Sequence, residues 1–592
     1  MTQYADRSTL WLLSRLLDRK DRIRLLVSLV LILVGTLLEM LSLGIVIPVV
    51  RTIVGGDRRS EYNWLPDFAE RMSYDNFVRA LLAGLVSVFV VKNSFQLLSS
   101  YFQQRVNLSI NNRLEQRLFE NYLEQPYEFH LTHSSSLLLR NVQAYSGAVV
   151  GNGIGPSLVL VTELLAGLGL LAVLVAVEPL ATAVIVILFA ASSVVVLRFS
   201  NSRTREWGPE RLAHRRRIIE ALLSGFGGIK EIKLFGRGQE VMDTHRESLY
   251  KASRTFYLFS LLQSVPRSIF EVVAVASVAV VVIIYTVGGG AAEDSLVIVA
   301  LFGVVAFRML PSVNRIIVSV QQLSIGRAAL EGAVEGIELP VPEQRRDETR
   351  LVERFDSLRV AELQYRYPNS QALVIDVEHL HVAAGESLGI VGSSGSGKST
   401  LVDLLIGILT PSSGTIHANG HDIAEHLRGW QDRIGYVPQH VYLMDTTVRR
   451  NVAFGLPEKS IDDQQVEESL RNANLWQFVQ TLPKRWDTVV GERGVRLSGG
   501  QRQRLGIARA LYGEPEVIVL DEATSALDTE TEREIVESFR DIARDRTLIV
   551  VAHRTSTLAY CSRVIRLEGG RIVRDGTFTE VIGSLTATDR GQ

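Results

Sequence analysis

Long apolar stretches fill the first half of the chain and are missing from the second half. The first of them, Leu25–Val50, carries a single charge, Glu39, and is longer than the ~20 residues that a helix needs to cross a bilayer. With the stretches that follow, it predicts six membrane spans: Leu25–Val50, about 77–104, Asn141–Val177, Pro179–Leu197, about 255–287 and about 292–325. We therefore expect an all-α membrane domain.

Lysine and arginine are distributed unevenly among the connections between these spans. They cluster before the first span and again over residues 198–254, between the fourth and fifth spans, whereas the turns at Glu178 and Gly288 carry none. Because positive residues collect on the cytoplasmic side of a membrane, we expect the N-terminus and the long connection to be cytoplasmic.

Two connections, residues 105–141 and 198–254, are too long and polar to be turns, and they predict membrane helices that extend into the cytosol. Breaks at Gln125-Pro126 and at residues 225–228 interrupt them. Such breaks favour short cross-helices, at about Gln125–His130 and Gly228–Phe235, that contact another domain. A plain helix–loop–helix without a partner is the alternative.

The pattern changes after Pro340. Residues 343–353 form a charged stretch typical of a linker, and from Phe355 short β-rich runs alternate with amphipathic segments. This alternation is typical of an α/β domain. The chain is therefore predicted to hold a transmembrane domain over residues 1–330, a linker over 331–354 and an α/β domain over 355–592.

Composition excludes several classes of protein. The chain has 592 residues, of which 47% are hydrophobic and 21% charged, and its 63 Lys and Arg balance 64 Asp and Glu. This balance argues against a nucleic-acid-binding protein, which carries a basic excess. Cys561 is the single cysteine, so no intrachain disulfide or cysteine metal cluster can form, and a buried or half-buried thiol is expected.

A phosphate-binding loop stands between a predicted strand, Ser387–Gly392, and a predicted helix, Leu401–Leu409. Its glycines allow backbone N–H groups to surround phosphate oxygens, and the helix N-terminus adds a positive dipole. Lys398 is expected to meet the β- and γ-phosphates and Ser399 to ligate Mg²⁺. The loop predicts an ATP site formed by Gly392, Ser393, Ser394, Gly395, Ser396, Gly397, Lys398, Ser399 and Thr400.

A second apolar strand, Val517–Leu520, ends in two acids, Asp521 and Glu522. A carboxylate at a strand end beside a phosphate loop suits Mg²⁺. We expect Asp521 to bind the metal and Glu522 to activate the attacking water.

The order of further motifs resembles the nucleotide-binding domain of ATP-binding cassette (ABC) proteins over about residues 355–582. Leu497–Gln501 resembles the family's signature motif, and Val490–Gly494 the exporter-specific loop before it. The resemblance implies adenine stacking by Tyr367, a Mg²⁺ and coupling role for Gln439, contact with the partner cassette by Ser525–Asp528, and a γ-phosphate contact by His553. It also implies that Ser498, Gly499, Gly500 and Gln501 bind the nucleotide held by a second cassette.

With six spans before one cassette, the chain resembles a half-size ABC exporter of the type IV fold, a helical transmembrane domain fused to a cytosolic α/β P-loop domain. This implies a homodimer in the bacterial inner membrane with ATP and Mg²⁺ as cofactors. A heterodimeric partner is the alternative.

Charged residues inside the spans suggest the cargo, because such residues are costly in a membrane and mark functional sites. The cations are Lys92, Arg267, Arg308 and Arg315, and the acids are Glu39, Glu163 and Glu271. Arg267 and Glu271 are four residues apart and could simply pair on one helix face. If Arg267, Arg308 and Lys92 face a cavity, they suit a phosphate or pyrophosphate.

Several membrane stretches, among them Val265–Arg267 and Ala306–Arg315, resemble the lipid-linked oligosaccharide flippases (PglK-like). The resemblance implies that Arg267 and Arg308 hold a lipid pyrophosphate. Residues 54–76 are charged where that group has an apolar external helix.

Three functions follow as hypotheses. The first is an ATP-driven flippase of a lipid-linked oligosaccharide or a similar anionic lipid. The second is a multidrug or apolar-lipid exporter of the same architecture, and the third is a regulatory cassette protein without transport. Stimulation of ATP hydrolysis by each class of compound would separate them.

Overall fold

The structure is a computed structural model that describes residues 7–55, 72–177, 179–287, 292–341, 353–523, 546–552 and 555–582. Its contacts divide the chain into two compact units. The first, which we call the helical unit, comprises Met1–Leu123 and His133–Pro340. The second, the sheet unit, comprises Glu124–Thr132 and Val341–Gln592.

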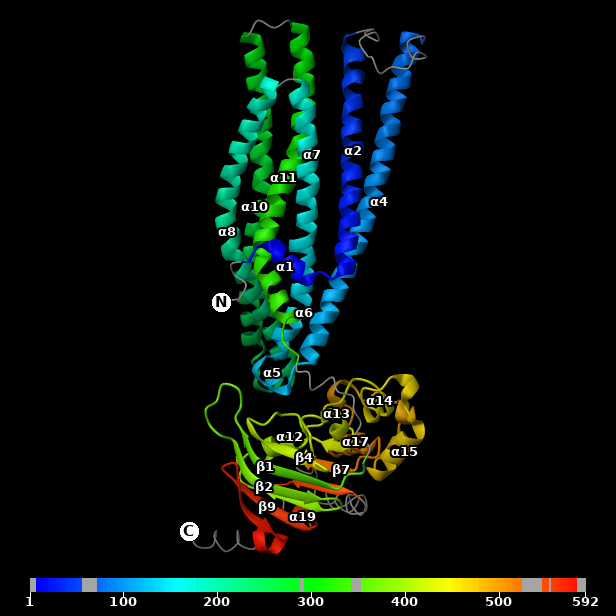
Figure 1. Cartoon of the computed structure of the whole chain (residues 1–592), viewed down its shortest axis with the longest axis vertical. Helices are drawn as coiled ribbons and strands as arrows, with labels where there is room; N and C mark the ends of the chain where they lie inside the picture. Colours follow the sequence, from blue (N-terminus) through cyan, green and yellow to red (C-terminus); the bar gives the residue numbers. More distant parts are fainter. Residues whose placement is uncertain are drawn as a thin grey trace. The chain divides into compact units, whose positions relative to one another are not determined.

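The helical unit is built from helices, most of them long (Figure 1). In chain order they are α1 (Thr9–Leu16), α2 (Arg19–Gly55), α4 (Tyr74–Leu123), α6 (Ser135–Ala148), the π-helical turn η2 (Val149–Ile154), α7 (Gly155–Val177), α8 (Pro179–Gly227), α9 (Ile229–Phe235), α10 (Gly238–Val287) and α11 (Ala292–Ile337). Every predicted span is helical. The predicted linker, 343–353, and the charged stretch 54–76 fall largely outside the described residues.

Five helical segments of the described chain are long and apolar enough to cross a membrane: Arg19–Ser42, Tyr74–Leu123, Ser135–Ala172, Thr182–Ser200 and Gly238–Ile283. The predicted sixth span falls on α11, where side chains up to residue 308 lie outside the described set, so its crossing stays a prediction. Large apolar side chains are exposed on these helices, as is typical of helices that are hydrophobic on all sides. Leu97 on α4 and Val272 on α10 are 73% and 70% exposed.

Two apolar clusters hold the helical unit together. In one, Leu12 and Leu16 of α1 are buried against α2, α4, η2 and α11. In the other, the rings of Phe189 on α8 and Phe270 on α10 stack at 5.7 Å between centroids. The amphipathic helix α1 is thus anchored into the bundle.

The π turn interrupts the third predicted span. The Gly155 N–H bonds the Val150 carbonyl oxygen, five residues back. Pro156 has no N–H to continue the α-helical ladder at this point, and glycine at 153 allows close packing, because a Cβ there would lie 3.1 Å from Leu13. Sequence reasoning predicted one continuous helix here; glycine and proline explain the irregular turn.

The sheet unit contains two sheets. The larger has the order β10-β9-β3-β8-β7-β6, with β10 antiparallel to β9 and its other neighbouring strands parallel. Its strands are β3 (Ser387–Val391), β6 (Ile434–Val437), β7 (Val517–Asp521), β8 (Thr547–Val551), β9 (Arg563–Glu568) and β10 (Arg571–Gly576). The smaller, antiparallel sheet has the order β2-β1-β4-β5 and consists of β1 (Ser357–Tyr365), β2 (Ile375–Ala383), β4 (Ser413–Ala418) and β5 (His421–Asp422).

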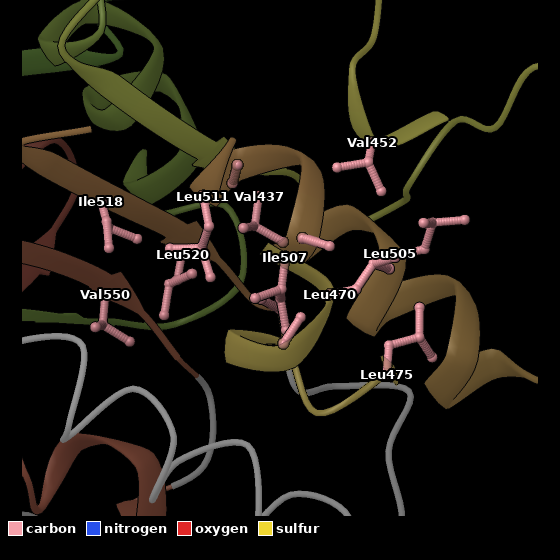
Figure 2. Packing of buried hydrophobic residues seen from close by; sticks show 14 of the residues in the cluster. Val437, Val452, Leu470, Leu475, Leu505, Ile507, Leu511, Ile518, Leu520 and Val550 are labelled. Carbon is pink, nitrogen blue, oxygen red and sulfur yellow. The ribbon is translucent and has the colours of Figure 1, made fainter. Parts of the chain in front are cut away.

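Short helices surround these sheets. They are α5 (Tyr127–Thr132), α12 (Lys398–Leu405), α13 (Leu427–Gln431), α14 (Val448–Val452), η4 (Glu458–Ser460), α15 (Asp463–Asn472), α16 (Trp476–Thr481), η5 (Arg485–Asp487), η6 (Glu492–Gly494), α17 (Gly499–Leu511) and α19 (Thr555–Leu558). Figure 2 shows Ile507 and Leu511 of α17 in the same cluster as Ile518 and Leu520 of β7. This packing fixes the predicted signature segment to the strand that carries Asp521.

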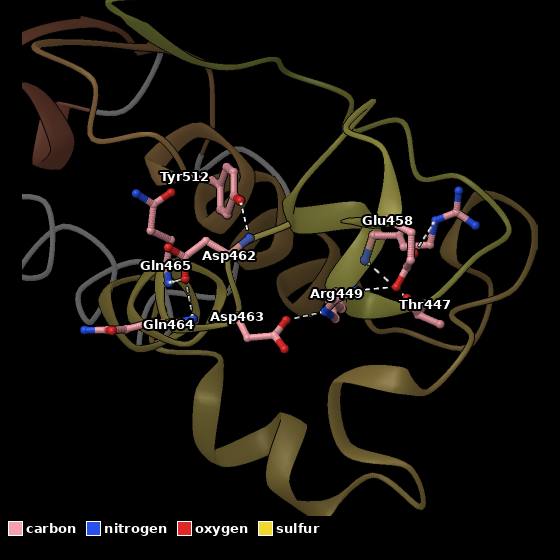
Figure 3. A network of polar contacts seen from close by, with 9 residues as sticks. Thr447, Arg449, Glu458, Asp462, Asp463, Gln464, Gln465 and Tyr512 are labelled. Atoms are coloured by element: carbon pink, nitrogen blue, oxygen red, sulfur yellow. Dashed lines mark hydrogen bonds and ion pairs between the residues drawn. The ribbon is translucent and has the colours of Figure 1, made fainter. Parts of the chain in front are cut away.

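A polar network also holds α14, α15 and the end of α17 in place (Figure 3). The Arg449 guanidinium makes ion pairs with Glu458 and Asp463. Asp462 caps α15 with its carboxylate, and its N–H donates to the Tyr512 hydroxyl at 3.0 Å.

Both predicted cross-helices are present, as α5 and α9. The first packs within the sheet unit, where the Thr410 N–H donates to Glu128 Oε1 at 2.9 Å. The second ends at Gly236, whose positive φ of 66° suits glycine at a helix C-terminus. The contact predicted for the first cross-helix is therefore confirmed.

Candidate nucleotide-binding and membrane sites

The predicted phosphate loop, residues 392–397, joins β3 to α12. Gly395 and Gly397 have φ of 79° and 100°, in the region that favours glycine. A Cβ on Gly392 would lie 2.3 Å from the Leu567 carbonyl oxygen, so the loop passes too close to β9 for any larger residue. The first turn of α12, Lys398–Thr400, follows directly and directs its N-terminal N–H groups toward the loop.

Lys398 is buried and folds back over the loop. Its Nζ donates to the carbonyl oxygens of Gly392 and Ser393 at 3.0 and 2.9 Å. Burial lowers the pKa of Lys398, and the negative charges of Glu522 and Asp521 act in the opposite direction. The buried Ser396 hydroxyl bonds no described residue, so the loop offers a polar group that a phosphate oxygen can satisfy.

Asp521 ends β7, one strand removed from β3, and therefore lies at the same sheet edge as the loop. The Ser399 hydroxyl donates to Asp521 Oδ1 at 3.4 Å. Burial raises the pKa of Asp521, and the bond from Ser399 lowers it. A hydroxyl and a carboxylate at this spacing fit Mg²⁺, which takes oxygen ligands and keeps several waters.

Glu522 has a φ of 51°, a strained value for a residue with a side chain. Its N–H donates to the Val551 carbonyl oxygen at 2.9 Å, which holds the strained turn against β8. Gln439, which follows β6, donates from Nε2 to Glu522 Oε2 at 2.7 Å. The structure thus brings Gln439 together with Asp521 and Glu522, the two acids predicted from a separate motif.

Tyr367 and the signature segment lie in distinct surroundings. The Tyr367 hydroxyl shares a 2.9 Å hydrogen bond with the Thr400 hydroxyl, which places the ring beside the start of α12.

The signature segment begins α17. Ser498 caps this helix, its hydroxyl accepts from the Gln501 N–H, and Gln501 Oε1 accepts from the Ser498 N–H. Gly499 and Gly500 begin the helix. Within the described residues, no hydrogen bond joins residues 498–501 to the phosphate loop.

Two predicted elements lie outside the described residues: His553 and the segment Ser525–Asp528. Their roles stay predictions. Cys561 is buried as expected, and burial raises the pKa of its thiol to about 12.

A membrane cavity of about 880 Å³ lies between α10 and α11, and we call it the arginine pocket. Arg267, Glu271, Asn314 and Arg315 line it, together with apolar residues that include Val275. Arg267 and Glu271 form no ion pair with each other or with any other described residue, so the local pair that the spacing allowed as an alternative does not form. Both side chains are exposed on α10.

Arg315 instead pairs across helices. Its Nε contacts Glu163 Oε1 of α7 at 2.5 Å, and Glu163 is buried. The sequence analysis did not predict this ion pair. The signal that could have indicated it is the presence of opposite charges, Arg315 and Glu163, in two otherwise apolar spans. Lys92 lies away from the arginine pocket, with its Nζ 5.1 Å from the Phe89 ring centroid. The Arg308 side chain lies outside the described set.

Comparisons with known proteins agree with this geometry. The family profile described as "ABC transporter" matches residues 376–525, and that described as "ABC transporter transmembrane region" matches residues 25–309. The ATP-dependent lipid A-core flippase of Alkalilimnicola ehrlichii is 30% identical over 84% of this chain and 85% of its own. The flippase of the same name from Ralstonia nicotianae is 32% identical over 84% of each.

Among solved structures, a bacterial Atm1-family ABC exporter with ATP bound has a TM-score of 0.76 and 22% identity, and the match covers 97% of this chain and 99% of that one. This likeness concerns the fold, in which a helical transmembrane domain is fused to an α/β nucleotide-binding domain. The family profiles and the flippase relatives show that the chain belongs to the ABC transporter family as a half-size exporter that hydrolyses ATP.

Proposed function

We propose that this exporter is a flippase that moves an anionic, phosphate-bearing lipid, such as a lipid-linked oligosaccharide, across the bacterial inner membrane. The observation that carries the proposal is the arginine pocket, in which two guanidinium groups lie beside an apolar wall. The relatives named as lipid A-core flippases support a lipid cargo.

Arg267 and Arg315 of the arginine pocket favour an anionic headgroup, and Glu271 adds one carboxylate to the same lining. Arg267 has no ion-pair partner among the described residues, and Arg315 has one, Glu163. An unpaired guanidinium in a low-dielectric region gains strongly from a phosphate, which it can bind through two parallel hydrogen bonds. The apolar residues Val275, Val278 and Leu310 give the acyl or prenyl chain a surface to contact.

We further propose that ATP hydrolysis uses the groups that meet at the β3–β7 edge. Lys398 and the loop N–H groups would bind the phosphates, Ser399 and Asp521 would hold Mg²⁺ with Gln439 nearby, and Glu522 would orient the attacking water. When bound, Mg²⁺ would neutralise the charge that develops on the phosphate oxygens. His553 is proposed to contact the γ-phosphate.

The active form is proposed to be a homodimer with six spans per chain and both the N-terminus and the sheet unit in the cytoplasm. The signature segment makes no hydrogen bond to the phosphate loop within the described chain, so it is available to nucleotide held by a second copy. The cross-helix α9 exposes Ile229, Leu234 and Phe235 by 49%, 74% and 69%. These apolar side chains would be covered by the second copy.

The test is ATP hydrolysis by the purified protein in liposomes that contain a polyprenyl pyrophosphate, a disaccharide-bearing polyprenyl pyrophosphate, lipid A or a neutral glycerolipid. We expect the anionic lipids to stimulate hydrolysis and Arg267→Ala to weaken the response at least ~10-fold in half-maximal concentration. The matched control is Arg237→Ala, an exposed arginine beyond α9 that pairs with Glu240. Equal stimulation by the neutral lipid, independent of Arg267, would contradict the proposal.

A drug or apolar-lipid exporter is the second candidate, because apolar residues form much of the arginine pocket. It predicts that neutral hydrophobic compounds stimulate hydrolysis in wild type and in Arg267→Ala alike. The same liposome experiment separates the two candidates.

A further inference from the structure

The helical unit contains a second cavity with a different lining. It has a volume of about 580 Å³ and lies among α4, the η2 region, α7 and α11. None of the described residues that line it is charged. Five of them carry side-chain amides: Gln103, Gln104, Asn107, Asn111 and Gln322. We call this cavity the amide pocket.

Most of these amides have unused hydrogen-bonding capacity. The side chains of Gln104, Asn111 and Gln322 bond no described residue, whereas Gln103 donates to Ser99. Asn107 Oδ1 is buried without a hydrogen-bond partner among the described residues. A buried carbonyl oxygen left in this state is costly, so the pocket is suited to a ligand that supplies donors.

The lining also defines the chemistry of that ligand. A primary amide both donates and accepts, as a hydroxyl group does, and it carries no net charge. An ion would find no opposite charge in this pocket, and an apolar group would leave several amides desolvated and unpaired. An uncharged, hydroxyl-rich group satisfies both conditions.

The opposite wall provides room for such a group. Gly147, Gly151 and Gly155 line it at intervals of one helical turn. A Cβ added to Gly147 or Gly151 would meet no atom within 4 Å. The backbone of this wall therefore faces open space without side chains. The wall lies beside the π turn η2, and π-helical turns are frequent at functional sites.

The amide pocket and the arginine pocket share α11. Gln322 lines the first and Arg315 the second, seven residues apart, so they lie two turns along nearly the same helix face, about 10 Å in rise. The Arg315–Glu163 pair joins α11 to α7 one turn from Val159, which lines the amide pocket. The headgroup of a single glycolipid can span the distance of about 10 Å between the two pockets.

We propose that the amide pocket binds the uncharged saccharide part of the transported lipid while the arginine pocket binds its phosphate. This inference rests on the proposed function and identifies the second part of the transported lipid. The substrate would be a glycolipid in which a sugar is attached to the phosphate, and not a phospholipid with a small headgroup.

The first experiment compares two probes in liposomes: a polyprenyl pyrophosphate, and the same lipid bearing a neutral disaccharide. For Gln322→Leu and Gly151→Leu, the latter filling the pocket, we expect the half-maximal concentration of the disaccharide lipid to rise at least ~10-fold and that of the sugar-free lipid to stay unchanged. The control is Gln116→Leu, an exposed amide of α4 bonded to Glu120. Equal changes for both lipids, or no change for either, would overturn the inference.

A second measurement separates this inference from the proposed function. In a Cys561→Ser background, Gly151→Cys places the single thiol in the amide pocket, and its labelling by a maleimide is timed with an alkyl disaccharide or an alkyl phosphocholine of equal chain length. Slower labelling with the disaccharide alone supports the saccharide site even if no anionic lipid stimulates hydrolysis. Equal labelling rates overturn it even if anionic lipids do stimulate.

Discussion

The sheet unit and the helical unit build their sites in opposite ways. The nucleotide site depends on unusual backbone: Gly395, Gly397 and Glu522 all have positive φ. Among the described residues of the helical unit, Gly236 alone does. Its two pockets lie on helices, and side chains line them together with the glycines at the π turn η2. Unusual backbone restricts which residues can stand at a position, whereas a helix surface accepts almost any residue, so only the first kind of site carries a strong sequence pattern.

The largest effect is expected from a change that keeps the backbone of the nucleotide site and removes its charge. Glu522→Gln can keep the contact with Gln439 but cannot accept a proton from water, so we expect ATP hydrolysis to fall at least ~100-fold with ATP binding retained. Steady-state hydrolysis and nucleotide binding measure this. Glu514→Gln is the control, because Glu514 is an exposed glutamate with a similar φ of 54°. Unchanged hydrolysis in Glu522→Gln would refute the role.

The next largest effect is expected from the Arg315–Glu163 ion pair of the helical unit. Arg315→Ala leaves the buried Glu163 without its partner, which should destabilise the protein by about 2–3 kcal/mol. Glu163→Gln should cost less, because the Arg315 side chain is 46% exposed and can reach solvent. Thermal unfolding of the purified protein measures both. Equal losses would mean that burial of Glu163 is not the cause.

A smaller effect is expected where the chain crosses from one unit to the other. Glu128→Ala removes the acceptor of the Thr410 N–H, which should weaken the attachment of α5 to the sheet unit. We expect lipid-stimulated hydrolysis to fall roughly 3- to 10-fold, with the basal rate unchanged. The exposed neighbour Glu124→Ala should leave both rates as they are. Parallel loss of the basal rate would indicate damage to the nucleotide site instead.

The last effect concerns an acid of the sheet unit. Burial, and then the charge of Asp521, raise the pKa of Asp403 on α12 to about 6. Because its folded pKa is raised, its contribution to stability is full below its unfolded pKa of about 3.9 and is lost as pH rises through about 6. Asp403→Asn should therefore stabilise the protein by roughly 1–2 kcal/mol at pH 7.5, and the gain should shrink toward pH 5. Unfolding at both pH values, with the exposed Asp445→Asn as control, measures it; a gain independent of pH would contradict the cause.

The features that could be predicted from the sequence are those that depend on residues close together in the chain. The strand before Gly392, the two acids at the end of β7 and the break at Gln125-Pro126 are each set by a few neighbouring residues, and the structure has β3, β7 and α5 at these places. The predicted spans are helical for the same reason.

What escaped prediction depends on which helix faces meet. Arg315 and Glu163 stand far apart in the sequence on different helices, and only packing brings them together. The amides of α4 and α11 give no signal individually, because an amide on a helix is usually a solvated surface residue. The spacing of Arg267 and Glu271 allowed a local ion pair as an alternative, and the structure forms no such pair, although both side chains line the arginine pocket.

The attachment of α5 gives the sheet unit a discontinuous sequence. Its own surface includes Glu124–Thr132, which lies more than two hundred residues upstream of the rest. If the sheet unit of one exporter is exchanged for that of another by cutting at the linker, the new unit lacks its own Glu124–Thr132 segment. It must then pack against the corresponding segment of the recipient protein. Working chimaeras should therefore carry Glu124–Thr132 along with the downstream domain, and the two segments are expected to be inherited together.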